Sequence, residues 1–369
     1  MDFTPTEEQE AARELAARIL GDLSTHERLA AGGGATDAEL WKALSAAGLP
    51  AAVEEIGLLG LVLLLEEQGR VTAQVPLAAT GVYGILAVAR HGTDEQRARL
   101  LPGLRDGTTV ATGAFPATGV VTATGVVTET GEDAAAGEGA ETGEGAARRG
   151  RLTGTVAWVP WLRDAAFVLV PDADRALWLV RTEYAGVEAV ELTAPWSAGR
   201  LVLDGTPAER LGGEAGESAP YEDVLAAART AFAGLQAGVC AGSLARAVAY
   251  TSVREQFGRP LATRQAVQLR AADAHMDTES IRVTAYEAAW RSDAGLDCAA
   301  AALTAAWWAS EAGKRVVHTG QHLHGGMGAD LEHPVHRHFL WGRQLDAYLG
   351  AGTELLAELG DLLAKGDPS

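Results

Sequence analysis

Cysteine is almost absent from this sequence. Cys240 and Cys298, the two cysteines in 369 residues, are too few for a disulfide framework or a cysteine-based metal knuckle. Both lie in alanine-rich stretches and are expected to be small buried thiols. Long hydrophobic runs are missing too: the longest, Ile56–Leu65, is too short to span a bilayer, and the acidic N-terminus MDFTPTEEQE is unlike a secretory signal. These absences predict a soluble, cytoplasmic protein.

Basic residues are scarce relative to acidic ones. With 30 lysines and arginines against 49 aspartates and glutamates, the net charge is -19, which argues against nonspecific binding of nucleic acid or of anionic membranes. Any anionic ligand must therefore meet local positive charge. The chain does have 47% hydrophobic residues and a mean hydropathy of +0.03, as expected for a globular protein with a large core.

Helical patterns occupy the two ends of the chain, with a β-rich stretch between them. Residues 1–107 indicate an N-terminal α-helical domain, 108–219 a small β domain and 220–369 a C-terminal four-helix bundle, so the fold class is α+β and mostly α. Thr6 and Gln9 have the spacing of a capping box. The expected helices are Thr4–Leu29, Asp37–Ala47, Glu54–Gly69, Ala78–His91, Asp94–Leu104, Tyr221–Ser252, Thr263–Asp293, Cys298–Leu323 and His336–Lys365.

The middle stretch is rich in threonine, valine and glycine and contains one low-complexity segment. Residues 118–150 carry abundant glycine and glutamate, so we expect a mobile surface loop there, and a linker-like insertion is favoured over a functional lid. The expected strands are Thr109–Phe115, Arg151–Val156, Ala166–Val170, Ala176–Arg181, Gly186–Val190 and Arg200–Leu203.

The stretch YTSVREQFGRP joins two of the long C-terminal helices. Gly258 can end the first helix, and Pro260 suits the start of the second. Arg254 offers a planar fork for phosphate, Gln256 can hydrogen-bond a base or ribose, and Phe257 offers a stacking face. The set would suit the pyrophosphate and adenine of a dinucleotide. In the structural alternative, Arg254 pairs with a carboxylate and Phe257 lies in the core.

A second stretch, QHLHGGMG, ends the third C-terminal helix. Gly325 and Gly326 let a ligand approach the backbone closely, although two adjacent glycines also serve as an ordinary helix end. Six of the nine histidines lie between His318 and His338, but their spacing matches no HExxH motif or Cys/His finger. No metal site is therefore predicted, and helix-dipole or subunit-surface contacts are the favoured interpretation of these histidines.

The order α, β, α, with R-x-Q-F-G-x-P and then GG-x-G followed by E-x-P-V-x-R, resembles the acyl-CoA dehydrogenase family over nearly the whole chain. The resemblance implies a flavin enzyme in which a glutamate removes the α-proton of an acyl-CoA and the β-hydrogen leaves as hydride to FAD. It also implies a flavin electron acceptor, and an arginine, amide and phenylalanine that reach across a dimer interface to the neighbour's FAD. The positions so assigned to FAD are Arg254, Gln256, Phe257, Gly258, His322, Gly325, Gly326, Trp158 and Thr353.

The sequence departs from the family where the catalytic base belongs. Ala351 stands at the glutamate's position in the turn before the last helix, and Ala228 stands at the alternative position, beside the matching Arg229. Neither alanine can accept a proton, which a thioester α-C–H requires. Glu354 is a disfavoured substitute because of its helical offset. Pro160 replaces the threonine that usually hydrogen-bonds the flavin, and it has no donor.

This pattern resembles the base-lacking subunit of the heteromeric α2β2 acyl-CoA dehydrogenases that actinobacteria use on steroid side chains. The resemblance implies a homologous partner subunit that supplies the glutamate, and an FAD at the shared interface. Two alternatives are a stand-alone flavoenzyme with non-standard chemistry and a structural partner without flavin. The sequence does not define the acyl group, and steroid-CoA follows from the resemblance alone.

Overall fold

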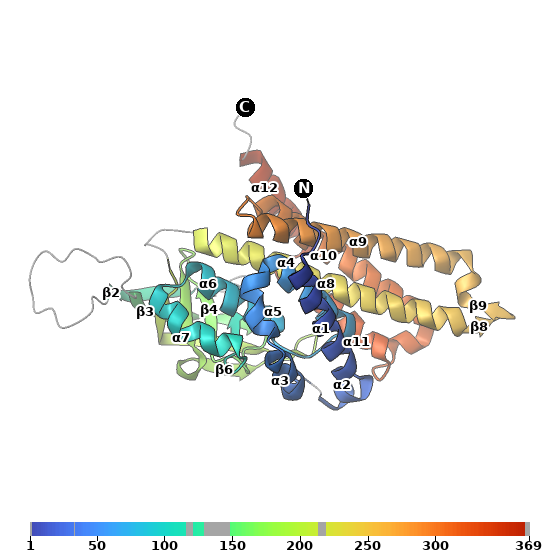
Figure 1. Cartoon of the computed structure of the whole chain (residues 1–369), viewed down its shortest axis with the longest axis horizontal. Helices are drawn as coiled ribbons and strands as arrows, with labels where there is room; N and C mark the ends of the chain where they lie inside the picture. Colours follow the sequence, from blue (N-terminus) through green and yellow to red (C-terminus); the bar gives the residue numbers. More distant parts are fainter. Residues whose placement is uncertain (1, 33, 116–120, 129–147, 213–218, 366–369) are drawn as a thin grey trace, which may run out of the picture. The chain divides into compact units, whose positions relative to one another are not determined.

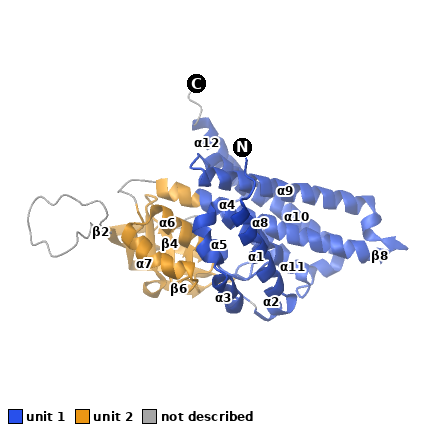
Figure 2. Ribbon diagram, in the orientation of Figure 1, with its two compact units in different colours: residues 1–78, 192–196, 226–369 blue, residues 79–191, 197–225 orange. Residues whose placement is uncertain are grey.

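The computed structural model describes residues 2–32, 34–115, 121–128, 148–212 and 219–365. The order of elements is helical, then β, then helical, which confirms the predicted fold class (Figure 1). By compactness the chain divides into two units (Figure 2): unit 1 is Met1–Ala78, Leu192–Trp196 and Ala226–Ser369, and unit 2 is Ala79–Glu191 and Ser197–Leu225. The boundaries of the three domains expected from the sequence stay a prediction.

Unit 1 begins with the helices α1 (Glu7–Leu23), α2 (His26–Gly32), α3 (Ala38–Ala46) and α4 (Leu49–Val71). The capping box is confirmed: the Thr6 hydroxyl accepts the N–H of Gln9 at 3.3 Å, and the Gln9 side chain accepts the N–H of Thr6 at 2.9 Å. The prediction of one helix over Thr4–Leu29 is wrong. Ser24 leaves the helical conformation and donates its N–H to the carbonyl of Leu20, which closes α1.

Helix α4 is interrupted by Gly57, whose backbone is left-handed (φ 69°, ψ -166°). The break leaves the N–H groups of Leu58 and Leu59 without helical partners, and the two carboxylate oxygens of Asp293 each accept one of them at 2.8 Å. A Cβ at Gly57 would lie 2.7 Å from that carboxylate, so both the φ angle and the space require glycine. A remote aspartate thus acts as the cap of the second half of α4.

A buried helical run comes next along the chain, in α5 (Leu77–Ala79), a π-helical segment (Thr80–Leu86) and α6 (Ala87–His91). It is followed by α7 (Asp94–Arg105). The two helices expected over these residues are confirmed, with small shifts at their ends. The sequence pattern did not indicate the π-helical geometry, which occurs frequently at functional sites.

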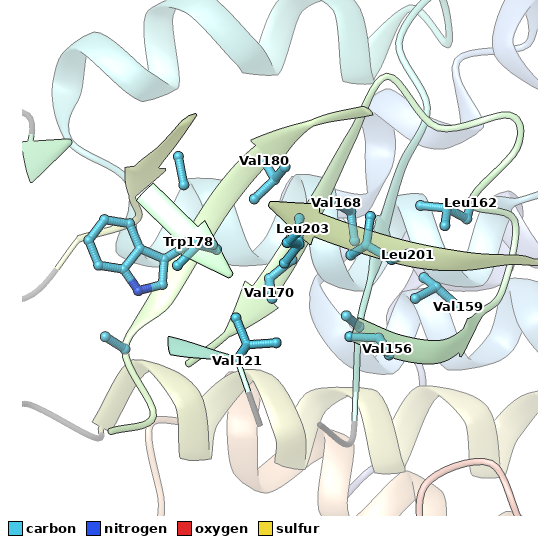
Figure 3. Close-up of a cluster of buried hydrophobic side chains, with 14 residues drawn as sticks. Val121, Val156, Val159, Leu162, Val168, Val170, Trp178, Val180, Leu201 and Leu203 are labelled. Atoms are coloured by element: carbon cyan, nitrogen blue, oxygen red, sulfur yellow. The ribbon is translucent and has the colours of Figure 1, made fainter. Parts of the chain in front are cut away.

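Unit 2 contains a sheet with the strand order β1-β4-β5-β7-β3-β2, and β6 also pairs with β7. The β1–β4 pair is parallel and the other pairs are antiparallel. Alternate residues of neighbouring strands, such as Val168 and Val170 of β4 and Trp178 and Val180 of β5, point into one buried core (Figure 3). The strands are β1 (Ala111–Gly113), β2 (Thr122–Thr128), β3 (Arg148–Val159), β4 (Phe167–Pro171), β5 (Leu177–Arg181), β6 (Gly186–Ala189) and β7 (Gly199–Arg210).

The prediction of a loop over residues 118–150 is wrong at β2 and at the start of β3. Strand β2 pairs with β3 from Thr122 opposite Thr153 to Thr128 opposite Arg148. Its sequence, TATGVVT, is rich in β-branched residues, which fit a pleated strand. The mobile loop predicted for residues 129–147 lies outside the described residues.

The C-terminal part of the chain consists of long helices. The single helix expected over His336–Lys365 is wrong, because Gly350 (φ 119°) turns the chain between two shorter helices. Cys240 is buried as predicted, whereas Cys298 stands at the N-cap of α10 and is partly exposed. The helices are α8 (Ala219–Val253), α9 (Gln265–Asp293), α10 (Ala299–His324), α11 (Pro334–Leu345) and α12 (Gly352–Lys365).

Helix α8 is long and apolar enough, by length and composition, to cross a membrane, and 89% of its most apolar window is buried inside the protein. The pair α3 and α4, bent by 76°, passes the same test when it is taken as one segment. Among the described helices no others pass. The core helix of a soluble protein meets these criteria as well, so the burial of α8 accounts for its composition.

Candidate functional site

The stretch between α8 and α9 forms a small β-hairpin. Strand β8 (Glu255–Gln256) pairs with β9 (Arg259–Pro260), and the two residues between them, Phe257 and Gly258, have φ angles of 55° and 75°. Two-residue hairpin loops with a left-handed backbone at both positions are type I′ turns. The expectation that the proline starts the second helix is wrong, because α9 begins only at Gln265, after a 3-10 turn.

The turn presents Phe257 to solvent. Its side chain is 91% exposed, which rules out a core position within this chain. The guanidinium of Arg264 lies 5.3 Å from the centre of the ring and also donates to the carbonyl of Gln256 at 2.9 Å, so it braces the turn. A bulky residue in the left-handed region costs about 1 to 3 kcal/mol, and such strain concentrates at binding sites. An exposed, strained aromatic side chain is therefore held ready for contact with another molecule.

Arg254 lies at the base of the same hairpin and is exposed. Its backbone closes the hairpin: its N–H donates to Tyr250 at 2.9 Å, and its carbonyl accepts the N–H of Leu261 at 2.8 Å. Within the described part of the chain, no carboxylate forms an ion pair with its guanidinium. The alternative in which Arg254 is a structural ion-pair partner is therefore not met by the described residues.

A ring stack joins the hairpin to the double-glycine turn. Tyr250, one helical turn before Arg254, stacks on His324 at the end of α10, with ring centres 4.8 Å apart and planes inclined by 21°. His324 is only 4% exposed, and its Nδ1 lies 2.7 Å from the carbonyl oxygen of Gly320. Because Gly325 follows His324 directly, two motifs that are distant in the sequence lie side by side. Sequence reasoning missed this link, because no local pattern marks a contact between Tyr250 and His324.

The turn after α10 has an open backbone. Gly325 has a φ of 64°, and a Cβ added at Gly325 or Gly326 would meet none of the described atoms within 4 Å. At Gly328, by contrast, the added Cβ would lie 2.3 Å from the carbonyl oxygen of Gln321, so the chain's own packing requires that glycine. At Gly326, no contact within the described chain requires a glycine. Close approach of another molecule to this backbone would require one. His322 is exposed on the last turn of α10.

The two positions predicted for a catalytic base differ in their surroundings. Ala228 is fully buried in α8, and Ala351 is partly exposed just before α12. The carboxylate of Glu354 accepts the backbone N–H of Ala351 at 3.0 Å and so caps the start of α12. The nearest glutamate in the sequence therefore has a structural partner, and neither alanine position offers a proton acceptor.

Arg229, next to Ala228, is held by an ion pair. Its guanidinium donates to both carboxylate oxygens of Glu358 on α12, at 2.8 and 2.6 Å, and the arginine is 8% exposed. Beside it, Tyr348 packs against Phe232 with ring centres 4.7 Å apart. The cavity left among these side chains measures about 20 Å³, which holds one water molecule at most. No sequence signal marked Glu358, because the pair joins residues that are 129 positions apart.

Trp158 lies near the end of β3 in unit 2 and is partly buried. The hydroxyl of Thr112 donates to the carbonyl of Pro160, two residues further on, at 2.5 Å. Pro160 has no N–H, and the hydroxyl proton of Thr112 is used by that carbonyl. Just beyond the end of β3, neither residue therefore has a side-chain donor left for a ligand.

Thr353 lies apart from the hairpin and the glycine turn. It follows Gly352, where an added Cβ would lie 2.2 Å from the carboxylate of Glu311 in the middle of α10. The fourteen residues from Glu311 to Gly325 correspond to about 21 Å along a helix. The predicted FAD residues thus form one group at the hairpin and glycine turn, a second at Thr353, and a third at Trp158 in unit 2.

The described residues contain no group of three or more histidines, cysteines, aspartates or glutamates placed to hold a metal ion. His333 caps α11, where its Nδ1 accepts the N–H of Val335 at 3.2 Å. His338 is 1% exposed, and its Nε2 lies 3.0 Å from the carbonyl oxygen of Arg70. Burial lowers the pKa of His338 to about 4, although the hydrogen bond to Arg70 opposes this shift. These two histidines of the cluster therefore have structural roles.

His338 is expected to make the protein less stable in mild acid. Its pKa is about 4 in the folded state and near 6.5 in the unfolded state, so the unfolded state binds more protons between these values and stability falls as the pH falls. Between pH 8 and pH 5 the expected loss is about 2 kcal/mol, measured by urea unfolding. His338→Gln should remove this part of the pH dependence, whereas the control His275→Gln, at an exposed position, should keep it. An unchanged pH dependence in His338→Gln would contradict the prediction.

Comparison with protein families now identifies the class. The model of the acyl-CoA dehydrogenase N-terminal domain matches residues 6–108, and that of the C-terminal domain matches residues 221–358. The two matches cover more than half of the chain, which therefore belongs to the acyl-CoA dehydrogenase family of flavoprotein oxidoreductases.

Individual relatives extend over the full length of the chain. It is 36% identical to acyl-CoA dehydrogenase FadE27 of Mycobacterium tuberculosis, over 99% of both chains. Among solved structures, it is similar to a variant of the Tcur3481-Tcur3483 steroid ACAD, with 40% identity, a TM-score of 0.86, and coverage of 98% of this chain and 99% of that one. It is also similar to the ChsE4-ChsE5 complex from Mycobacterium tuberculosis, with 32% identity, a TM-score of 0.86 and full coverage of both chains.

Proposed function

We propose that this chain is the base-lacking subunit of a heteromeric acyl-CoA dehydrogenase, which catalyses α,β-dehydrogenation together with a homologous subunit that carries the glutamate. The observation that carries the proposal is the combination of alanine at both base positions, Ala228 and Ala351, with an exposed set of FAD-type residues. Two of the similar structures bear the names of two-component proteins, one of them a steroid ACAD, which supports a heteromer and a steroid side-chain acyl-CoA as substrate. A cytoplasmic location and a flavin electron acceptor are part of the proposal.

The exposed residues of the hairpin and the glycine turn suit an FAD that is bound jointly by this chain and a second chain. The hairpin offers a guanidinium at its base, an amide on β8 and an exposed ring at its tip for pyrophosphate and adenine, and the open backbone at Gly325 and Gly326 allows close approach. We assign Arg254, Gln256 and Phe257 to the adenosine end of the cofactor. Further proposed contacts are Gly258, His322, Trp158 and Thr353.

The side chains of this chain indicate which part of the reaction it carries out and which part the partner subunit carries out. A bound flavin accepts the hydride equivalent that leaves the β-carbon of an acyl-CoA. This chain holds and orients the cofactor, but Ala351 cannot take the α-proton, and Glu354 is occupied as a helix cap. The proton must therefore pass to a carboxylate of the partner subunit.

The test is to purify the chain alone and after co-expression with a homologous subunit that has glutamate at the position of Ala228 or Ala351. We expect a stable complex with bound flavin and acyl-CoA-dependent dye reduction, and no turnover by the chain alone. Replacing the partner's glutamate with glutamine should abolish turnover while flavin stays bound. A lone chain that is flavin-loaded and fully active would refute the proposal and favour a stand-alone flavoenzyme. An active complex whose flavin is insensitive to Arg254→Ala would favour a purely structural subunit.

A further inference from the structure

Unit 2 has a pocket of about 450 Å³, lined by residues of α7, β3, β4, β5 and β7. Strand residues alternate between the two faces, so Val168, Trp178 and Val180 enter the core while Phe167 and Leu179 line the pocket. Helix α7 contributes to one side of the pocket. The residues assigned above to FAD do not line it.

The pocket lies beside a gap in the sheet, between the β5–β7 ladder and the β6–β7 ladder. Strand β5 pairs with β7 only through Trp178 opposite Arg210 and Leu179 opposite Glu209. Strand β6 pairs with the other end of β7, no further along it than Val202. Between these ladders the edge of β7 has neither strand beside it, and the residues bordering this opening line the pocket: Arg181, Tyr184, Pro207 and Ala208.

The register brings apolar and basic side chains together at this opening. Leu179, Glu209 and Arg149 stand opposite one another on three neighbouring strands, β5, β7 and β3. Phe167 on β4 stands opposite Arg181 on β5. Phe167 and Leu179 are 5% and 7% exposed and form an apolar floor. Three exposed arginines also line the pocket, so it offers both apolar surface and basic groups.

Among the described side chains that line the pocket, arginines outnumber carboxylates, although the chain carries a net charge of -19. Three arginines line it, Arg99, Arg149 and Arg181, with one carboxylate, Glu209. Glu209 is neutralised by Arg99 at 2.6 Å and accepts a further hydrogen bond from Gln96 at 2.7 Å. Arg181 contacts Glu183 at 3.0 Å, but both side chains are more than half exposed, and such surface pairs contribute little and exchange readily.

We propose that this pocket binds an amphipathic anion, a medium-length apolar chain that ends in a carboxylate or a phosphate. The volume lies within the range of small-molecule sites, which are typically about 300 to 1,000 Å³. The apolar body would cover Phe167, Leu179 and Leu100, and the anion would meet the guanidinium groups of Arg181 and Arg149. Planar guanidinium groups suit both anions, because they donate two parallel hydrogen bonds to a carboxylate or a phosphate.

The experiment titrates the full chain with octanoate, octyl phosphate and octanol by calorimetry. We expect saturable binding of one anion per chain and at least tenfold weaker binding of neutral octanol. The double variant Arg149→Gln, Arg181→Gln should bind the anion at least tenfold more weakly, while Arg200→Gln, an exposed arginine of β7 outside the pocket, should bind it as the wild type does. The tighter of the two anions identifies the head group.

Three outcomes would overturn the inference. It fails if neither anion binds saturably, if octanol binds as tightly as the anions, or if the double variant matches the wild type. Equal urea midpoints would show that the variants are folded, as expected for exposed arginines. Because the readout is binding to the chain without turnover, it is independent of the proposed dehydrogenase function.

Discussion

Replacing Arg254 and Phe257 together by alanine is expected to weaken FAD binding by the co-purified complex roughly 60- to 700-fold. Charge-assisted hydrogen bonds from a guanidinium to a pyrophosphate contribute about 1.5 to 3 kcal/mol, and an aromatic stack adds about 1 kcal/mol. Every tenfold change corresponds to about 1.4 kcal/mol, which gives the expected range. The measurement is the flavin absorbance per complex, followed by titration of the apo-complex with FAD.

The same hairpin provides the matched control. Arg259 on β9 is exposed and carries the same charge, but it is not among the residues assigned to FAD. Arg259→Ala should therefore keep the wild-type flavin content. A double variant that retains flavin like the wild type would disprove the assignment of the hairpin. Equal loss in Arg259→Ala would indicate a general effect of charge instead of specific contacts.

The second large effect is expected on stability, from Arg282→Met. Glu66 on α4 is 1% exposed, and the Nε of Arg282 lies 3.0 Å from its Oε2. Arg282 also pairs with Glu279. Removing the arginine leaves a buried carboxylate without its counter-charge, which costs about 3 to 5 kcal/mol in the free energy of unfolding. Urea unfolding measures this loss.

The pH dependence separates this mechanism from a simple loss of packing. Burial already raises the pKa of Glu66, and Arg282 opposes that shift. Without Arg282 the folded-state pKa rises further above the unfolded value, so Glu66 is tolerated while protonated and destabilises the fold as the pH rises through that pKa. The loss caused by Arg282→Met should therefore be larger at pH 8 than at pH 5.

Two further variants complete the stability test. The double variant Glu66→Leu, Arg282→Met removes both charges and should lie within about 1.5 kcal/mol of the wild type. Arg315→Met breaks a more exposed pair with Asp277 and should cost less than about 1 kcal/mol. If Arg282→Met proves no more harmful than Arg315→Met, or equally harmful at both pH values, the buried pair does not have the role described.

Local sequence patterns predicted much of the fold and the candidate site. Helical periodicity located most of the helices, and the resemblance to the family led to the predicted cofactor motifs and to the prediction that the base is missing. The elements that the sequence patterns did not predict were missed for local reasons as well. The type I′ turn escaped notice because its first residue is Phe257 and not the asparagine or aspartate that usually marks such turns. Strand β2 was missed because a repeated, glycine-containing segment has the composition of a loop.

The sequence by itself determined the family, the order of helical and β segments, and the absence of a proton acceptor at Ala228 and Ala351. These properties depend on residue type and short-range periodicity, which are legible along the chain. Only the tertiary structure decided that Tyr250 and His324 join the two predicted cofactor motifs, that Glu358 pairs with Arg229, and that the sheet opens along β7 between its ladders with β5 and β6. Such contacts depend on how distant segments pack, because each of them is made by residues that no local pattern brings together.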